Sequence, residues 1–169
     1  MKAFKVFSLS PFIIALIVPF FCSFTLPGEL SDMVLTKADA EKIMGEPVAL
    51  TEEKKELKDG VTKNYITYTA LHKEALTNRP IALYSNFQEF KDSDLAKNAY
   101  SAITKNNAQM SGHSSVSGIG DEAWYHSDGE NFGLIMVRRN EKLLIIKINK
   151  TTKTFSREEL MSVCRRLMK

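Results

Sequence analysis

The sequence predicts an α+β domain in which helices flank an antiparallel sheet of about five strands, in the order α-β-β-α-β-β-β-α. Apolar residues alternate along several short segments, as they do in strands that bury one face. Other segments repeat apolar residues every three or four positions and begin near a Ser or Thr, as capped helices do. The connections between the predicted strands have hairpin length, which favours antiparallel pairing.

The first predicted helix covers 36–44, with Thr36 as its N-cap and Gly45 as the residue that ends it. Residues 48–50 are a candidate for a further short strand, outside the five counted above. The next segment, 51–60, reads TEEKKELKDG and carries charges of both signs. Mixed charge favours a solvated loop or hairpin over a binding patch at this position.

Two longer strands follow, at 64–71 and 81–87. In the first of them, Ile66, Tyr68 and Ala70 lie on one face. The second strand alternates in the same way. The segment HKEALTNRP between them reads as a loop, so we expect the two strands to pair antiparallel.

A long helix is predicted over 94–108, capped by Ser93. Its apolar stripe should pack on the sheet and consists of Leu95, Ala99, Ala102, Ile103 and Ala108. The segment that follows, SGHSSVSGIG at 111–120, has the strongest loop composition in the chain.

Three strands are predicted after this loop, at 123–126, 132–138 and 142–148. A turn at 128–129 joins the first strand to the second, and a three-residue turn joins the second to the third. Residues 143–146 are apolar on both faces. This pattern predicts a central strand that is covered on both sides.

The final helix is predicted over 157–168, with Ser156 as its N-cap and Glu159 at the capping-box position. Cys164 lies on the apolar face of this helix, together with Leu160, Leu167 and Met168. A buried, unreactive thiol is therefore favoured over a reactive one.

The N-terminus has the pattern of an export signal. Two lysines in the first five residues precede an apolar run over 12–26, which a proline interrupts. This run is shorter than the ~20 residues that a membrane-spanning helix needs. We expect cleavage after Thr25, which divides the chain into a signal peptide at 1–25 and a single domain at 26–169. The domain would then work in the periplasm, at the cell surface or as a secreted protein, without a stable transmembrane anchor.

Cys22 raises the alternative of a lipid anchor. A lipobox needs small residues directly before the cysteine, and Phe20 and Phe21 stand there instead. A lipid anchor at Cys22 is therefore not expected, although lipidation and an uncleaved leader stay open as alternatives. If Cys22 leaves with the leader, Cys164 is the remaining thiol and no internal disulfide can form.

Charge argues against nucleic acid as a partner. The net charge of +3 includes two lysines of the leader, and the rest of the chain has 21 Lys and Arg residues against 20 Asp and Glu residues. No basic segment stands out of the kind that phosphate backbones attract. We expect no nucleic-acid binding.

The sequence contains no motif of a known reaction. The histidines, His72, His113 and His126, lack the H-x-H or H-x-x-x-H spacing of metal ligands. Nothing resembles a nucleophile elbow or a P-loop. We therefore expect no catalytic residue, no metal and no cofactor.

The segment GIGDEAWY at 118–125 is the most distinctive in the chain, because its two glycines allow an unusual backbone at the entry of a strand. Adjacent side chains of a strand point to opposite faces, so Asp121 and Glu122 would make a poor acid–base pair. Trp124 and Tyr125 should also face opposite ways. We expect one of these two rings to be partly exposed beside the preceding loop.

The candidate ligand or partner contacts are therefore His113, Asp121, Trp124 and Tyr125, which lie in or just after this loop. The alternative is that the segment forms a tight turn and that its aromatic residues pack on the sheet.

Three segments, LTKADAEKIMGEPV, GIGDEAWYHSDGENFGLIMVRRNEKLLIIKIN and SREELMSVCRRLM, resemble families of small exported bacterial domains of unknown function. The similar families are mycobacterial-type secreted lipoprotein domains and the extracellular sensor domains of certain receptor kinases. They share a Gly-x-Gly-Asp-Glu-Ala-aromatic turn, then a hairpin and a helix. The resemblance implies an antiparallel sheet flanked by helices, in some cases PsbP-like, and a binding or accessory role. It transfers no functional residue, and this chain departs from the lipoprotein members in its poor lipobox.

The function that the sequence favours is that of an exported, noncatalytic binding or accessory module of the cell envelope, with a ligand or protein partner that the residues do not identify. An enzyme of unrecognised type, or a periplasmic inhibitor or chaperone-like protein, stays open as the alternative. An enzyme should bring titratable groups together in a cleft, whereas a binding module should show an apolar concave surface.

Overall fold

The computed structural model describes residues 33–73 and 80–169. The predicted signal peptide at 1–25 and Cys22 lie outside the described residues. The described elements are, in chain order, α1 (Lys37–Met44), β1 (Val48–Lys58), β2 (Val61–Lys73), β3 (Pro80–Glu89), α2 (Ser93–Asn107), β4 (His113–Val116), β5 (Glu122–Ser127), β6 (Gly133–Arg139), β7 (Lys142–Ile148) and α3 (Arg157–Leu167).

The predicted α+β class is confirmed, but the predicted strand number and order are wrong. The described ranges contain seven strands rather than about five, in the order α-β-β-β-α-β-β-β-β-α. The differences come from β1, which is much longer than expected, and from β4, which was expected to be loop.

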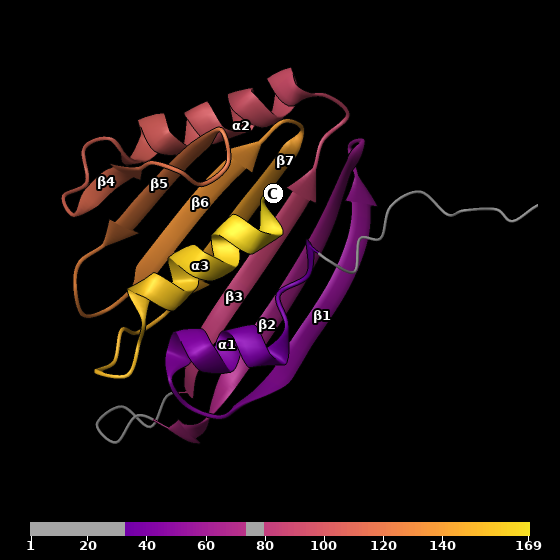
Figure 1. Cartoon of the computed structure of the whole chain (residues 1–169). Coiled ribbons are helices and arrows are strands. Elements are labelled where there is room, and N and C mark those ends of the chain that lie inside the picture. The colour runs from indigo at the N-terminus through magenta and orange to yellow at the C-terminus, as the bar shows by residue number, and fades with distance from the viewer. Residues whose placement is uncertain (1–32, 74–79) are drawn as a thin grey trace, which may run out of the picture.

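All seven described strands form one antiparallel sheet with the order β1-β2-β3-β7-β6-β5-β4. Figure 1 shows α1 and α3 together on one face of this sheet and α2 on the other. β3 pairs with β7 at the centre and so joins the N-terminal strands to the C-terminal ones. The antiparallel pairing predicted between 64–71 and 81–87 is confirmed by the pairing of β2 with β3.

β1 contains most of the charged segment that was predicted as a solvated loop or hairpin. The strand runs to Lys58 and pairs with β2, and Asp59 and Gly60 turn the chain with φ angles of 53° and 75°. The expected hairpin turn is therefore present. The segment is a strand despite its charges because β1 is an edge strand whose side chains there lie mostly in solvent.

β4 corrects the prediction of a continuous loop over 111–120. Its four residues pair with β5 at the other edge of the sheet, with His113 opposite His126 and Val116 opposite Ala123. The segment has no apolar alternation because it buries little, and backbone pairing alone makes it a strand.

The sheet has a core on each face. Under α1 and α3, residues such as Ile66, Leu83 and Leu144 pack against Ile43 of α1 and Leu160 of α3. The smaller core under α2 consists of Tyr100, Trp124, Met136 and Leu143. β7 contributes to both cores, so the predicted central strand with two covered faces is confirmed.

The helix caps at the two ends of the described chain match the prediction. Thr36 caps α1 through a capping box with Asp39, and Gly45 ends it in the left-handed conformation. Ser156 caps α3 by accepting from the backbone N–H of Glu159. None of the described helices is long and apolar enough to cross a membrane.

α2 differs from its prediction at the N-cap and on the buried face. Asp92 rather than Ser93 caps the helix, through a 2.9 Å hydrogen bond that its carboxylate accepts from the Leu95 N–H. The buried residues are Ala96 and Tyr100, whereas Leu95 is 46% exposed. Tyr100 packs with the aromatic and apolar residues of β5–β7, and this contact places Leu95 outside the buried face.

Candidate functional site

The segment at 118–125 owes its shape to a close approach between two backbones. Gly120 has a φ of +58°, and a Cβ atom there would lie only 2.5 Å from the carbonyl oxygen of Arg138. The Asp121 N–H donates a 2.8 Å hydrogen bond to that same oxygen. A side chain at Gly120 would clash with β6, so glycine is required at this entry to β5.

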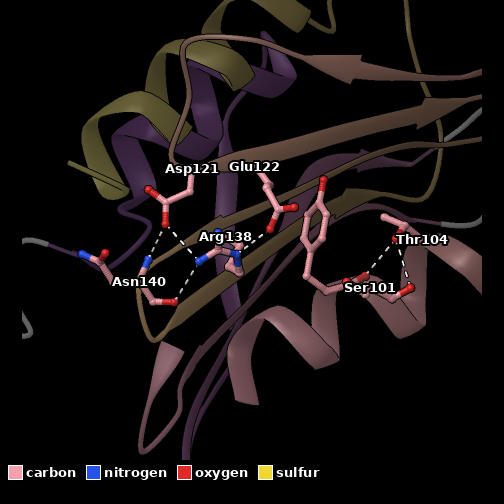
Figure 2. Close-up of polar contacts among 7 residues, drawn as sticks. Ser101, Thr104, Asp121, Glu122, Arg138 and Asn140 are labelled. Carbon is pink, nitrogen blue, oxygen red and sulfur yellow. Dashed lines mark hydrogen bonds and ion pairs between the residues drawn. The ribbon is translucent and has the colours of Figure 1, made fainter. Parts of the chain in front are cut away.

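Arg138 brings the two acidic residues of the segment together, as Figure 2 shows. Its Nε donates to Glu122 Oε2 at 2.6 Å, and its Nη1 donates to Asp121 Oδ2 at 2.9 Å. The backbone N–H of Asn140 also donates to Asp121 Oδ2, at 2.8 Å. The expectation that the two carboxylates point apart is wrong, because Asp121 precedes β5 and strand alternation does not apply to it.

This cluster braces β5 against the β6–β7 turn rather than preparing a proton transfer. Arg138 is 9% exposed, and both carboxylates bind its guanidinium. Burial, together with the charge of Glu122, raises the pKa of nearby Tyr100 to about 12, so its phenol stays protonated at neutral pH. A phenol that stays protonated at neutral pH is a poor general base.

The two aromatic residues of the segment are both buried, so the expectation that one ring is partly exposed is wrong. Trp124 and Tyr125 are each 7% exposed, and they face opposite ways as predicted. Trp124 packs with Tyr100 under α2, whereas the guanidinium of Arg157 on α3 lies 4.2 Å from the centre of the Tyr125 ring. Both rings are covered because this end of the sheet carries a helix on each face.

The histidines divide into one pair and one distant residue. His113 is exposed and stacks on Trp124 with ring centres 5.7 Å apart, and buried His126 lies opposite it across β4 and β5. His72 is on β2, with Nδ1 3.8 Å from a carboxylate oxygen of Glu46. Within the described ranges, no group of three or more His, Cys, Asp or Glu residues could hold a metal ion.

The four predicted contact residues therefore do not form one surface. His113 and Asp121 are exposed, but they contact different partners, and Trp124 and Tyr125 are buried on opposite faces. His113 and Tyr125 line one hollow, of about 520 Å³, whereas Asp121 and Trp124 line another, of about 410 Å³. Their role as ligand or partner contacts stays a prediction.

A different surface is available on the α2 face of the sheet. α2 packs on β6 and β7, and no described helix covers β1, β2 or β3 on this face. The two faces of β3 differ in exposure. Leu83 and Phe87 lie on the face that α1 and α3 cover and are 0% and 5% exposed, whereas Tyr84 lies on the α2 face and is 41% exposed.

Two adjoining hollows lie on this face of the sheet, one beside the C-terminal end of α2 and one over the strands that α2 leaves uncovered. The first, about 470 Å³, lies between the C-terminal end of α2 and strands β5–β7, and Met110 and Phe132 line it. The second, about 270 Å³, lies over β2, β3 and β7, and Tyr65 and Tyr84 line it. Both share Leu134 and Lys147. We call them together the α2-face groove, defined by Tyr65, Tyr84, Phe132, Leu134, Ile145 and Lys147.

Lys147 is the cation at the junction of the two hollows. It lies between Tyr84 on β3 and Leu134 on β6 in the strand register, and it is exposed. It has no ion-pair partner among the described residues. Its ammonium group is therefore available to an anion that enters the groove.

Two acidic residues also line the groove, Asp128 in the first hollow and Glu52 in the second. Asp128 accepts hydrogen bonds from the backbone of Glu130, Asn131 and Phe132, in the turn predicted at 128–129. The side chain of Asn131, followed by these N–H groups, lowers the pKa of Asp128 to about 2. At the other end, Glu52 accepts a 3.2 Å hydrogen bond from the Thr67 hydroxyl.

The second hollow also contains an unsatisfied polar atom. The side-chain oxygen of Asn86 is buried and has no hydrogen-bond partner among the described residues. Asn86 lies between Tyr65 and Ile145 in the strand register and lines the hollow with them. Such orphaned acceptors are uncommon in folded proteins, and this one is buried below the surface of the hollow.

Sequence reasoning missed this groove because it assigned α2 to the sheet without deciding how much of the sheet one helix can cover. One feature of the sequence could have indicated the groove. In the predicted strands, Tyr65 and Tyr84 lie on the face opposite to the one that carries Ile66 and Leu83. Large aromatic side chains on a face that is otherwise polar often indicate a contact surface. In comparisons with known proteins, no family model and no curated protein match the chain.

Proposed function

We propose that this protein is an exported, noncatalytic binding module and that its contact surface is the α2-face groove. The observation that carries the proposal is the pair of hollows beside and beyond α2, which aromatic and aliphatic side chains line and which meet at the exposed Lys147. Concave sites with an apolar lining and few polar groups are the usual binding sites of proteins.

The acidic cluster at Arg138 supports a binding module over an enzyme. A hydrolytic or proton-transfer site needs a carboxylate, imidazole or thiol whose pKa suits its task. Asp121 and Glu122 are paired with Arg138, and burial raises the pKa of the Cys164 thiol to about 12. An inhibitor or chaperone-like role would use the same groove and is included in the proposal as a special case of binding.

Export rests on the leader pattern of the sequence, namely two lysines followed by the apolar run over 12–26. Mass spectrometry of the protein from its native cells tests this part of the proposal. An N-terminus between about Ser23 and Gly28 supports cleavage and export, whereas a native protein that retains Met1 contradicts cleavage. A diacylglycerol-modified Cys22 would replace a free exported domain with a lipid-anchored one.

The groove is tested with an amphipathic fluorescent anion, 8-anilinonaphthalene-1-sulfonate. The folded protein should bind the probe at one saturable site, with its apolar rings in a hollow and its sulfonate near Lys147. The variant Ile145→Glu places a charge on the half-buried floor and should abolish the fluorescence increase. Leu57→Glu, at a 75% exposed position of β1, is the matched control and should bind like the wild type.

Urea unfolding of both variants separates loss of binding from loss of fold. Equal probe binding by the wild type and by a folded Ile145→Glu variant would show that the probe binds elsewhere. Absence of saturable binding by the wild type would contradict the groove as a binding surface.

A further inference from the structure

We infer that β1 pairs with β1 of a second copy of this chain, antiparallel and about a twofold axis, so that one sheet runs through both molecules. The inference does not rest on the α2-face groove, because it concerns the edge of the sheet rather than its face. Three features of β1 carry it: its free backbone edge, the order of its charges and its two exposed leucines. Because the axis is perpendicular to the sheet, the α2 faces of the two copies would lie on the same side.

β1 is a long edge strand with one side unpaired. It has 11 residues and pairs with β2 on one side, and no described strand pairs with it on the other. Figure 1 shows β1 along the outer edge of the sheet. Such an edge presents a row of N–H and C=O groups that a further strand can bind, and proteins often discourage this pairing with charged side chains. The order of the charges on β1 therefore decides whether a second strand is repelled or bound.

The twofold axis limits the possible registers. It keeps each side chain on its own face of the sheet, so residues that lie opposite each other across the axis must share a face of β1. β1 has a bulge between Leu50 and Glu52, where its register against β2 shifts. Past this bulge, Lys54 pairs with Tyr65, a residue of the α2-face groove. The residues of β1 on the α2 face are therefore Glu52, Lys54, Glu56 and Lys58.

One register joins opposite charges at every contact on the α2 face. With the axis at Lys55, Glu52 lies opposite Lys58 of the second copy, and Lys54 lies opposite its Glu56. The axis repeats both contacts. Moving the axis by one residue toward either end instead places Lys54 opposite Lys54 or opposite Lys58. Cross-strand pairs of opposite charge are stabilising and directly opposed like charges are destabilising, so the charges select the register centred on Lys55.

The other charges near this contact fit the same register. On the α2 face, Lys63 of β2 lies beside Glu56, so that carboxylate would have a lysine on either side. On the opposite face, the two copies of Lys55 meet at the axis, which is a like-charge contact. Glu53 of each copy lies diagonally across from Lys55 of the other, within reach of its long side chain, and offsets this repulsion.

The two exposed leucines of β1 also gain a contact. Leu50 is 49% exposed and Leu57 is 75% exposed, and both lie on the face that α1 and α3 partly cover. In the register centred on Lys55, Leu57 lies opposite Glu53 of the second copy. Because of the bulge, Leu50 is the next residue after Glu53 along that face. Leu57 of one copy and Leu50 of the other are therefore diagonal neighbours at each end of the paired segment.

The test uses charge reversal in two complementary variants. Lys54→Glu/Lys58→Glu makes the α2 face of β1 wholly acidic, and Glu52→Lys/Glu56→Lys makes it wholly basic. Sedimentation equilibrium of the purified wild type, up to about 1 mM and at low salt, should show a reversible monomer–dimer equilibrium. Each variant alone should associate about tenfold or more weakly, and an equimolar mixture of the two should dimerise again.

Lys97→Glu/Lys153→Glu is the matched control, because it makes the same change in net charge as the acidic variant at exposed positions outside β1. It should dimerise like the wild type. Urea unfolding of each variant checks that it is folded. Recovery of the dimer in the mixture is a second check, because an unfolded variant could not restore it.

Cysteine cross-linking tests the register. Directly opposed residues of antiparallel strands have Cα atoms ~4.5–5.5 Å apart, within the ~4.4–6.8 Å that a disulfide spans. Lys55→Cys should therefore give a disulfide-linked dimer on mild oxidation with copper–phenanthroline. Leu57→Cys is the control, because its two copies would lie about 13 Å apart, four residues at ~3.3 Å each. Cys164 is buried and does not compete.

Four results would overturn the inference. The wild type could remain monomeric up to about 1 mM, the acidic and basic variants could associate as the wild type does, or their mixture could fail to dimerise. Cross-linking of Leu57→Cys as efficient as that of Lys55→Cys would be the fourth. None of these results changes the binding of the fluorescent probe, so the proposed groove is tested separately.

Discussion

Arg166 on α3 donates a 2.6 Å hydrogen bond to Asp39 on α1, and the same carboxylate oxygen accepts from the backbone N–H and the hydroxyl of Thr36. Asp39 therefore completes the capping box of α1 and joins the two helices that cover one face of the sheet. Only 12% of its side chain is exposed. Helix capping and tertiary packing depend here on one carboxylate.

The Asp39→Asn variant should be less stable by about 1–3 kcal/mol at neutral pH, because a charged acceptor of several hydrogen bonds is lost. Burial alone would raise the pKa of Asp39, but the hydrogen bonds from Thr36 and the charge of Arg166 outweigh it, so the pKa is lowered from its usual value of 3.8. This stabilisation is fully present above pH ~4 and is lost as the pH falls through the lowered folded pKa. Urea unfolding at pH 7 and at successively lower pH should show the difference from the wild type shrinking.

Substitutions of two neighbouring arginines on α3 test the contact between Arg166 and Asp39 from the α3 side. Arg166→Ala should be destabilised at neutral pH, whereas Arg165→Ala, at the neighbouring exposed position, should lie within ~0.5 kcal/mol of the wild type. Equal stability of the two variants would show that the bond to Asp39 contributes nothing measurable.

Trp124→Ala and Tyr125→Ala should each lower the free energy of unfolding by about 3–5 kcal/mol, because both rings are buried. Tyr84→Ala removes an aromatic ring that is 41% exposed in the α2-face groove, and it should cost within ~0.5 kcal/mol. Urea unfolding of the three variants measures the loss in the free energy of unfolding that each substitution causes. A small loss for either Trp124→Ala or Tyr125→Ala would mean that the ring is available for contacts after all.

Gly120→Ala should be clearly less stable than Gly118→Ala. Both glycines have positive φ angles, so both substitutions carry the strain of a left-handed side chain, about 1 kcal/mol. At Gly120 the new Cβ would also lie 2.5 Å from the Arg138 carbonyl oxygen, whereas at Gly118 no atom lies within 4 Å. Thermal unfolding compares the two variants directly, and equal melting temperatures would contradict the close approach to β6.

Arg138→Leu should lower the free energy of unfolding by about 1–3 kcal/mol, because Asp121 and Glu122 lose their shared partner and remain near each other. Both carboxylates are partly exposed, and solvent limits the loss. Adding Glu122→Gln to Arg138→Leu should recover part of the stability, as a double-mutant cycle would show. No recovery would mean that packing of the Arg138 side chain, rather than its charge, holds β5 to β6.

Cys164 should react slowly with a thiol reagent in the folded protein and quickly in concentrated urea. The side chain is 0% exposed, and burial raises the pKa of its thiol to about 12, so almost no thiolate is present at neutral pH. The labelling rate of Cys164 without denaturant is compared with its rate in urea. Rapid labelling of the folded protein would place Cys164 outside the core.

The sequence alone determined the elements whose signal is local. The capped helix at Thr36 and the capped helix at Ser156 were predictable because a cap is set by a few neighbouring residues. The buried position of Cys164 and the central place of β7 followed from apolar periodicity, which records burial directly. The α+β class followed from the same patterns.

Only the tertiary structure decided what depends on distant backbones. β1 and β4 are strands because they pair at the edges of the sheet, and edge pairing leaves no apolar pattern in TEEKKELK or HSSV. Asp121 and Glu122 meet because Arg138 lies across from them on β6, 17 and 16 residues away in the chain, respectively. Periodicity says which face of a strand is apolar, but it does not say how many strands one helix covers. The α2-face groove exists because α2 covers only part of a seven-stranded sheet, and that extent is fixed by packing between segments far apart in the sequence.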